Sequence, residues 1–285
     1  MLLTVGDLFE EILIHLRAPA RLGVDMSVRS ARVRGGSAAN VAAIDAETGG
    51  TPRFVGQVGD DALGYVLTDD LRSRGVEVLA SHAGGTGVAV TTIGNGTRTR
   101  LIDRGASRGP ARIDPSVLDG ATQVYLPASV FTEDPLASAI DRLLAEIRDR
   151  RMRLVIGGPG TDDLELLGTD PFRELGRTAR PDAVVMNRRA HAALGLAAGE
   201  SLTGAKVTVV TAGPDPTTVS QDSGAAASVP VRPVAAIRDH TGAGDGFLAG
   251  FLASLRAGAD PVSATNAGHR IAARVLGQLG PTSRS

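Results

Sequence analysis

The chain has 285 residues, of which 42% are hydrophobic and 21% are charged, so it holds enough apolar material for a globular core. Its net charge of −1 gives no global field that would favour nucleic acid or a membrane surface as a partner. The absence of cysteine excludes disulfides, thiolate nucleophiles and cysteine metal sites. No apolar run is long enough to span a bilayer and the first residues do not resemble a signal peptide, so we expect a cytoplasmic protein.

The first predicted strand is the apolar run of residues 2–5, which Gly6 and Asp7 close. A buried strand that ends on a glycine and an acid is typical of the ligand-binding edge of an α/β sheet. Residues 8–16 and 24–33 mix apolar and polar positions, so we predict partly exposed strands there.

A double glycine, Gly35-Gly36, stands before an alanine-rich predicted helix. Ser37 can cap this helix, and Asn40 falls in its first turns, pointing toward the glycine end. The two glycines allow a ligand to approach the backbone closely. Close packing without a ligand explains the same pattern about as well, so the motif alone leaves both interpretations open.

More β structure is predicted between residues 53 and 104. A strand at 53–56 precedes a helix that ends near Arg74, and further strands are expected at 76–79, 88–93 and 97–102. The last two flank Asn95-Gly96, which is the strongest short hairpin signal. We expect the segments near 8–34 and 76–104 to form a small β lid.

From about residue 114 the predicted elements alternate between strand and helix. Strands are predicted at 123–126, 153–156, 183–186 and 206–210, and helices at 135–148, 171–179, 247–256 and 261–279. A hairpin is predicted over 217–229. Repeated strand–helix units indicate a mainly parallel sheet with helices on both faces, which binds ligands beyond the carboxyl ends of its strands. No linker or internal repeat divides the chain, so we expect a single domain over residues 1–285.

Near the C-terminus, Gly242-Ala243-Gly244 is followed at once by Asp245 and then by an apolar helical run. The unpaired N–H groups at such a helix start form an anion site, because the helix dipole is positive there. A carboxylate beside that site is unfavourable unless it accepts a proton from a hydroxyl that attacks a bound phosphate. A glycine-rich turn with an Asp in the first helical turn is also a common structural pattern. This motif alone therefore does not distinguish a catalytic site from a structural turn.

In their order along the chain these motifs resemble those of the ribokinase-like (PfkB) carbohydrate kinase family. Asp239–Phe247 matches the C-terminal signature, and residues 35–42 with 56–64 match the N-terminal signature. Asn187 and Thr211-Ala212-Gly213, each after a predicted strand, are similar to the nucleotide-side elements. The resemblance spans nearly the whole chain and implies a ribokinase-like α/β fold, with a mainly parallel central sheet, helices on both faces and a small β lid.

The resemblance also implies phosphorylation of a hydroxymethyl group on a sugar or sugar derivative, with ATP and Mg²⁺. Asp245 would be the catalytic base, and the backbone of Gly242, Ala243 and Gly244 would form the anion hole. The substrate-binding residues would be Gly35, Gly36, Asn40 and Glu11, with Asp7 as the alternative carboxylate. Arg104 on the lid is a candidate contact for an anionic substrate, and a solvated surface arginine is the other interpretation. The nucleotide would contact Asn187, Thr211 and Gly213. Asn266 is a candidate for the adenine pocket, and an Asn on the helix surface fits the same position. No residue is assigned as a metal ligand.

Three departures from the family pattern stand out. Glu11 occupies the position where the family usually has Asp. The family's Asn-x-x-Glu motif ends here in Ala190, and its Asp-Pro-Asn stretch reads Gly158-Pro159-Gly160, so polar groups linked to Mg²⁺ and the phosphates are missing. These changes motivate an alternative, a sugar- or nucleotide-binding or regulatory protein with weakened catalysis on a kinase fold. A nicotinamide-dependent oxidoreductase is disfavoured, because no Gly-x-Gly-x-x-Gly fingerprint follows the first strand.

Substrate identity stays open at this point. Ribose, a ketohexose, a 2-keto-3-deoxy sugar acid and a nucleoside all fit the pattern. Family analogy also predicts a homodimer through the lid, with apolar lid positions such as Ile12, Ile14 and Val90 at the contact. The five histidines show no metal-ligand spacing, and we assign them no role.

Overall fold

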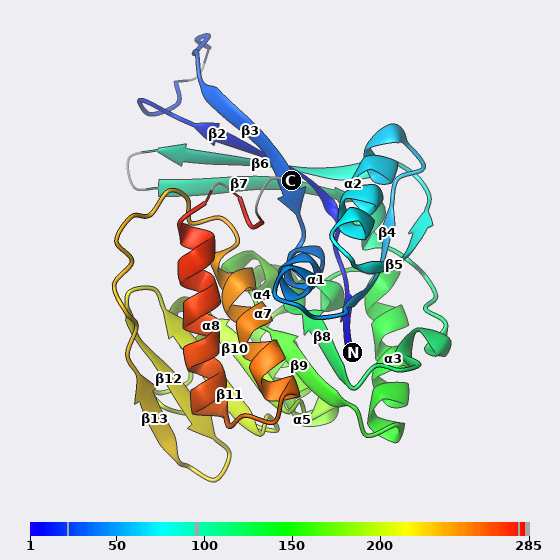
Figure 1. The fold of residues 1–285 in the computed structure, drawn as a ribbon, viewed down its shortest axis with the longest axis vertical. Coiled ribbons are helices and arrows are strands. Elements are labelled where there is room, and N and C mark those ends of the chain that lie inside the picture. The colour runs from blue at the N-terminus through cyan, green and yellow to red at the C-terminus, as the bar shows by residue number, and fades with distance from the viewer. Residues whose placement is uncertain (22, 95–96, 279, 283–285) are drawn as a thin grey trace.

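The fold consists of a large central sheet with helices on both faces and a smaller sheet at one end (Figure 1). It is known from a computed structural model that describes residues 1–21, 23–94, 97–278 and 280–282. The central sheet has the strand order β13-β12-β11-β10-β9-β8-β1-β4-β5. Its strands are β1 (Leu2–Val5), β4 (Arg53–Val58), β5 (Glu77–His82), β8 (Gln123–Pro127), β9 (Arg153–Gly157), β10 (Ala183–Asn187), β11 (Val207–Ala212), β12 (Asp215–Gln221) and β13 (Ala226–Val229).

Neighbouring strands from β5 to β11 pair in parallel, and the hairpin of β12 and β13 extends the sheet in antiparallel pairing. The helices are α1 (Ser37–Glu47), α2 (Ala62–Ser73), α3 (Leu136–Asp149), α4 (Thr161–Leu167), α5 (Thr169–Ala179), α6 (Arg188–Ala193), α7 (Ala243–Arg256) and α8 (Pro261–Leu276). Short 3₁₀ turns occupy Ala106–Arg108, Pro115–Leu118 and Ala128–Phe131. The predicted α/β class is confirmed.

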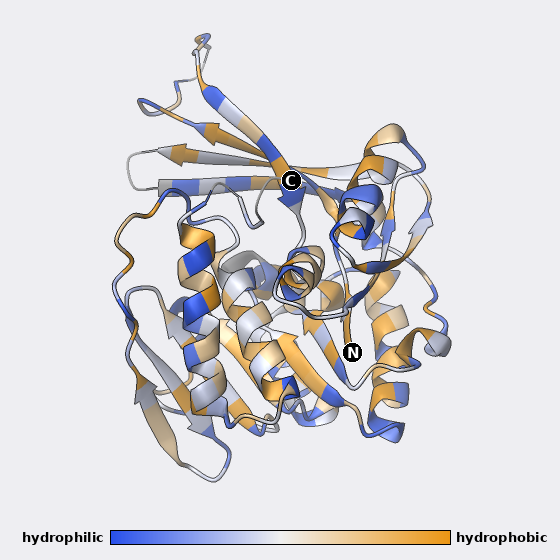
Figure 2. Cartoon of the chain, viewed as in Figure 1, coloured by the Kyte–Doolittle hydropathy of each residue, from blue (hydrophilic) through white to orange (hydrophobic). Residues whose placement is uncertain are grey.

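The strands of the central sheet are apolar on both faces, because each face is covered by helices. Leu3 packs in one core cluster with Leu143 of α3, and its neighbour Leu2 packs in the other with Val41 of α1 and Phe251 of α7. Successive side chains of a strand point to opposite faces, so the alternation assigns each residue to one core. Figure 2 shows the resulting hydrophobic strands in the middle of the sheet.

The smaller sheet has the order β3-β2-β6-β7 and forms the lid. Its strands are β2 (Phe9–His15), β3 (Arg29–Gly35), β6 (Thr86–Gly94) and β7 (Thr97–Gly105). The pairing of Gly94 with Thr97 confirms the strands of the predicted hairpin, while its turn, Asn95-Gly96, lies outside the described residues. In Figure 1 the lid stands over one end of the central sheet, close to the C-terminus of the described chain.

Several predicted boundaries were wrong. The segment 76–82 does not belong to the lid, because β5 pairs in parallel with β4 at the edge of the central sheet. Helix α4 was not predicted, and α7 begins at Ala243, earlier than the predicted Phe247, so Asp245 lies within the helix rather than before it. The predicted end of the last helix at residue 279 lies outside the described residues. Among the residues that the structure describes, no helix is long and apolar enough to cross a membrane.

Candidate functional site

Asp245 lies in the first turn of α7, where two side chains from a distant part of the chain hold its carboxylate. Ser37 donates a hydrogen bond from Oγ to Oδ1 at 2.7 Å, and Asn40 donates from Nδ2 to Oδ2 at 2.9 Å. Both donors belong to the first turns of α1. The two glycine-rich motifs, which the sequence separates by about 200 residues, therefore meet at one carboxylate.

The pKa of the Asp245 carboxyl is raised above its ordinary value of 3.8 because burial disfavours the charged form. Hydrogen bonds from Ser37 and Asn40 oppose this effect, as does the positive charge of Arg100, whereas Glu11 raises the pKa further. A carboxylate with a raised pKa is a better proton acceptor near neutral pH than an ordinary aspartate. The environment of Asp245 therefore suits a general base.

The turn before α7 is fixed by its own side chains. Asp239 accepts hydrogen bonds from the backbone N–H of Thr241 at 3.0 Å and, through its other oxygen, from that of Gly280 at 3.0 Å. Gly242 has φ +80°, and a Cβ there would lie 2.4 Å from Pro281, so only glycine fits. At Gly244 a Cβ would meet nothing within 4 Å. The predicted anion hole therefore lies in a rigid turn, and the space next to Gly244 is open to a ligand.

A cavity of about 440 Å³ opens beside this turn. Thr211 and Gly213, predicted on the nucleotide side, line it together with Ala243 and Gly244 of the predicted anion hole. The remaining lining is largely apolar and includes Val231, Val234, Ile237, Phe247, Ala272 and Leu276. A pocket of this size with an apolar wall and a polar end is typical of a small-molecule site.

Two predicted nucleotide contacts are not among the residues that line this cavity. Asn187 is exposed and caps α6, since its Oδ1 accepts the N–H of Ala190 at 2.8 Å. Asn266 is exposed and donates to the carbonyl of Val262 in its own helix at 3.1 Å. His269, on the same helix as Asn266, lines the cavity instead. No sequence motif marks this histidine.

On the substrate side, Asp7 and Arg104 form a buried ion pair between the core and the lid. The guanidinium Nη1 lies 2.8 Å from Asp7 Oδ2, and Nη2 donates to Asp163 at 3.2 Å. Burial raises the pKa of Asp7, although Arg104 opposes the rise. Gly36 has φ +101° and a Cβ there would lie 2.0 Å from the Asp7 carbonyl, so this glycine lets α1 begin against the end of β1. At Gly35 a Cβ would meet the ring of Phe9 at 2.2 Å.

Glu11 is a buried lid residue of β2. Its Oε1 accepts from Thr91 Oγ1 at 2.7 Å and from Arg98 Nη2 at 3.2 Å, and it lies 3.6 Å from Arg100 Nε. The guanidinium of Arg100 stands 5.3 Å from the centre of the Phe9 ring. The charges of Glu11 and Arg100 both act on Asp245. The lid thus brings one carboxylate and two guanidinium groups together near the Asp245 carboxylate.

Arg34 was missed at the sequence level, although it contacts the site. It is 6% exposed and donates from Nε to Asn40 Oδ1 at 3.3 Å and from Nη2 to Thr282 at 3.2 Å. Its Nη1 is paired with Asp70 of α2. Because Arg34 occupies the Asn40 oxygen, the amide nitrogen is left facing Asp245. In the sequence Arg34 is marked only by its position directly before the double glycine, whereas its burial and its partners depend on the tertiary fold.

The structure does not assemble a complete protein cage for the Mg²⁺ that the family resemblance implies. Across the described residues, no group of three or more His, Asp or Glu side chains is arranged to hold a metal ion. Ala190, where the family has an acid, is fully buried. Arg188, two positions earlier, pairs with Asp215 at 3.0 Å. The side chains therefore fit an ion held mainly by nucleotide phosphates and water.

The chain matches known proteins over most of its length. The family model for pfkB family carbohydrate kinases matches residues 13–152 and 178–285. Probable fructokinase-7 of Arabidopsis thaliana is 28% identical over 281 residues, which cover 87% of this chain and 77% of that protein.

Solved structures show the same fold. Adenosine kinase from Sinorhizobium meliloti superposes with a TM-score of 0.86 at 22% identity and covers 99% of this chain and 95% of its own. A sugar kinase from Pyrococcus horikoshii, solved in complex with ATP, gives a TM-score of 0.81 at 20% identity over 99% and 94% of the two chains. The predicted ribokinase-like fold is thereby confirmed. With most of its length matched by the family model, the chain belongs to the pfkB family of carbohydrate kinases.

Proposed function

We propose that this kinase transfers the γ-phosphoryl group of ATP to a hydroxymethyl group of a sugar or sugar derivative, with Asp245 as the base. The observation that carries the proposal is the position of the Asp245 carboxylate. Ser37 and Asn40 hold it at the N-terminus of α7, next to the cavity lined by Ala243 and Gly244. A base, an anion-binding turn and a nucleotide-sized cavity are the parts that phosphoryl transfer needs.

In this proposal Asp245 takes the proton of the substrate hydroxyl. The hydroxyl oxygen forms a bond to the γ-phosphorus as the bond to the leaving ADP oxygen breaks. The backbone N–H groups of Gly242, Ala243 and Gly244 stabilise the charge on the transferring group, aided by the positive end of the α7 dipole. Mg²⁺, when bound with the nucleotide, would neutralise phosphate charge. No residue of this chain is assigned to it.

We place the nucleotide base in the apolar part of the 440 Å³ cavity. His269 stands there with Nε2 2.8 Å from Thr217 Oγ1, and its Nδ1 is buried without a hydrogen-bond partner in the described structure. Burial lowers the pKa of His269, so the ring is neutral at pH 7. Its tilted contact with Phe247, at 5.4 Å between ring centres, fixes the plane of the imidazole. His269 is our leading candidate to pack its ring against a purine, with Thr211 and Gly213 toward the phosphates. Asn187 and Asn266 stay weaker predictions.

Charge balance favours a neutral polyol as the acceptor. Arg104 is paired with Asp7 and Asp163, and Arg98 and Arg100 share Glu11, so the three arginines nearest the site are matched by three carboxylates. The carboxylate of a sugar acid would need a further positively charged side chain that has no acid partner. We therefore rank ketohexoses, which the fructokinase relative suggests, and ribose ahead of 2-keto-3-deoxy sugar acids. A nucleoside is equally neutral, so it remains among the candidate acceptors.

The alternative function is a kinase-fold protein that binds sugar and nucleotide with weakened catalysis. The buried Ala190 in place of the family's acid is the observation that favours it. The intact contacts of Asp245 and the open turn at Gly244 argue against it. A homodimer through the lid stays a prediction. Leu101 on β7, which is 66% exposed, adds an apolar position to that surface. The cytoplasmic location also stays a prediction.

A two-step experiment tests the proposal. Thermal shifts are measured first with fructose, ribose, adenosine and 2-keto-3-deoxygluconate, each with a non-hydrolysable ATP analogue, because a bound ligand raises the melting temperature. ATP consumption with Mg²⁺ is then measured for every compound that shifts it. Turnover of a neutral polyol supports the proposal. Tight binding of both ligands without turnover favours the alternative, and turnover restricted to the sugar acid overturns the charge-balance argument.

A further inference from the structure

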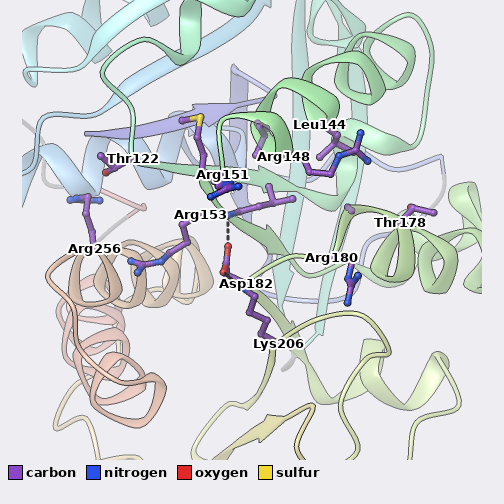
Figure 3. A pocket seen from close by; sticks show the side chains of 14 residues that line it. Thr122, Leu144, Arg148, Arg151, Arg153, Thr178, Arg180, Asp182, Lys206 and Arg256 are labelled. Atoms are coloured by element: carbon purple, nitrogen blue, oxygen red, sulfur yellow. Dashed lines mark hydrogen bonds and ion pairs between the residues drawn. The ribbon is translucent and has the colours of Figure 1, made fainter.

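A second cavity, of about 610 Å³, lies at the opposite edge of the central sheet from Asp245. It opens at the amino ends of β9, β10 and β11, where α3, α5 and α7 end (Figure 3). Its floor is apolar and includes Leu144, Ile147 and Leu154. Its rim carries six basic side chains, from Arg148, Arg151, Arg153, Arg180, Lys206 and Arg256. Arg148, Arg151 and Arg153 come from one basic segment at the end of α3 and the start of β9, and the fold brings Arg180, Lys206 and Arg256 beside them.

Three of these cations lack a carboxylate partner. Lys206 pairs with Asp182 at 2.7 Å, Arg256 with Asp45 at 2.7 Å, and Arg148 approaches Asp149 at 3.8 Å. Within the described part of the chain, Arg151, Arg153 and Arg180 have no acid within ion-pair distance, and Arg153 donates to the carbonyl of Leu255. In a chain whose net charge is −1, this is a local excess of positive charge.

Helix dipoles offset part of that excess positive charge. The carboxyl ends of α3, α5 and α7 each contribute about −0.5 charge to this edge, about −1.5 in all. About +1.5 then remains uncompensated. A phosphate monoester carries about −1.5 to −2 at pH 7, so one such group would balance the cluster. In Figure 3, Arg256 and Arg180 stand on opposite sides of the hollow, with Arg151 and Arg153 between them.

Two of the unpaired arginines have a backbone conformation that arginine disfavours. Arg151 has φ +55° and Arg180 has φ +47°, and every other positive-φ residue in the described chain is a glycine. Arg151 occupies the left-handed position of a helix end, where the N–H of Met152 bonds to the carbonyl of Ile147 at 3.0 Å. Glycine fits both positions with less strain. Retained strain at two residues of one cavity indicates that their side chains serve a purpose there.

We propose that this cavity is a second binding site, for a small phosphate monoester. The three unpaired guanidinium groups would bind the phosphate, since a planar fork of donors suits phosphate oxygens. The apolar floor would receive the body of the ligand. The size of the hollow favours a small molecule over a polymer. The site is independent of the proposed function, because it uses none of the residues around Asp245.

Lys206 provides a readout that is specific to this cavity, because it is the only lysine of the chain and is exposed. The full-length protein is treated with an acetylating reagent, and the modification rate of Lys206 is followed by mass spectrometry. Inorganic phosphate, fructose 6-phosphate and AMP serve as probes, with fructose as the uncharged control. We expect saturable protection by a phosphate-bearing probe, weakened by added salt, and none by fructose. The midpoint is the probe concentration that gives half of the maximal protection of Lys206. Equal midpoints for all phosphate-bearing probes would assign the site to free phosphate. A lower midpoint for fructose 6-phosphate or for AMP would assign the site to a sugar phosphate or to a nucleotide, respectively.

The test variant is Arg151→Gly/Arg180→Gly, which removes two cations and relieves the backbone. Its fold should survive, as circular dichroism will show. Its protection midpoint should rise about tenfold or more, because each lost charge-assisted hydrogen bond weakens binding by roughly that factor. Arg151→Lys/Arg180→Lys should retain most of the protection. Arg112→Gln/Arg270→Gln, an equal loss of charge at exposed positions outside the cavity, should behave as wild type.

Three results would overturn the proposal. They are no protection of Lys206 by any phosphate-bearing probe, an unchanged midpoint in the double glycine variant, and an equal rise in the Arg112/Arg270 control. The last would show that only overall surface charge matters.

Discussion

Asn40 donates a 2.9 Å hydrogen bond to the carboxylate of Asp245, and this contact joins the two glycine-rich ends of the chain. Its direction is set by Arg34, whose Nε donates to the other end of the same amide at 3.3 Å. With its oxygen engaged, the amide can only present its N–H₂ group to Asp245. A buried arginine outside the family motifs thus orients a residue inside them.

The variant Arg34→Met should therefore impair catalysis by freeing the Asn40 amide. We expect kcat/KM to fall about 10- to 100-fold, the range of one lost hydrogen bond to a charged network. Stability should also fall, since Asp70 and Thr282 lose a partner. Arg74→Gln is the matched control, because it removes another arginine partner of Asp70 without touching Asn40. In steady-state kinetics we expect kcat/KM to fall more in Arg34→Met than in Arg74→Gln. Equal losses of kcat/KM in the two variants would show that Arg34 acts only on stability.

The pH dependence of activity should respond to the lid charges in opposite directions. If Asp245 is the base, as we propose, activity requires its ionised form, so kcat/KM should fall as pH falls through the raised pKa of that carboxyl. Glu11→Gln removes a charge that raises this pKa, so the acidic limb should move to lower pH. Arg100→Gln removes a charge that lowers it, so the limb should move to higher pH. Profiles of kcat/KM that shift in the same direction for both variants would contradict the electrostatic account.

Adding one methyl group at neighbouring glycines should separate catalysis from stability. At Gly244 a Cβ meets nothing within 4 Å and the residue lines the 440 Å³ cavity that we propose for the nucleotide, so Gly244→Ala should keep its melting temperature and lose most turnover. At Gly246 a Cβ would lie 2.8 Å from Val275, so Gly246→Ala should lower the melting temperature by overpacking α7 against α8. Thermal melts and kcat for the two proteins provide the check. A stable and fully active Gly244→Ala enzyme would exclude the proposed anion hole.

The sequence predicted the class of the fold correctly, because fold class depends on local patterns. Apolar runs marked the strands of the central sheet, and the glycine motifs marked the starts of α1 and α7. What it could not predict depends on tertiary contacts. The segment 77–82 reads as an exposed strand in either sheet, and only its pairing with β4 decides between them. Arg34 and His269 are single residues whose importance comes from partners far away in the chain, at Thr282 and Thr217.

The variant Asp245→Asn tests whether Asp245 is the general base, and its fold should remain intact. Because burial raises the pKa of Asp245, the ionised carboxylate destabilises the fold as pH rises from 3.8 through that higher pKa. Asparagine removes the buried charge and can still bond to Ser37 and Asn40. We therefore expect its melting temperature at pH 7 to be at least that of wild type, and equal or lower below pH 3.8.

The most direct measurement is single-turnover phosphoryl transfer by Asp245→Asn, together with its affinities for the ATP analogue and the acceptor sugar. The account predicts a rate about 100- to 10,000-fold below wild type, the contribution of a general base, with both dissociation constants unchanged within about threefold. A variant that transfers phosphate at the wild-type rate would contradict the assignment of Asp245 as the base.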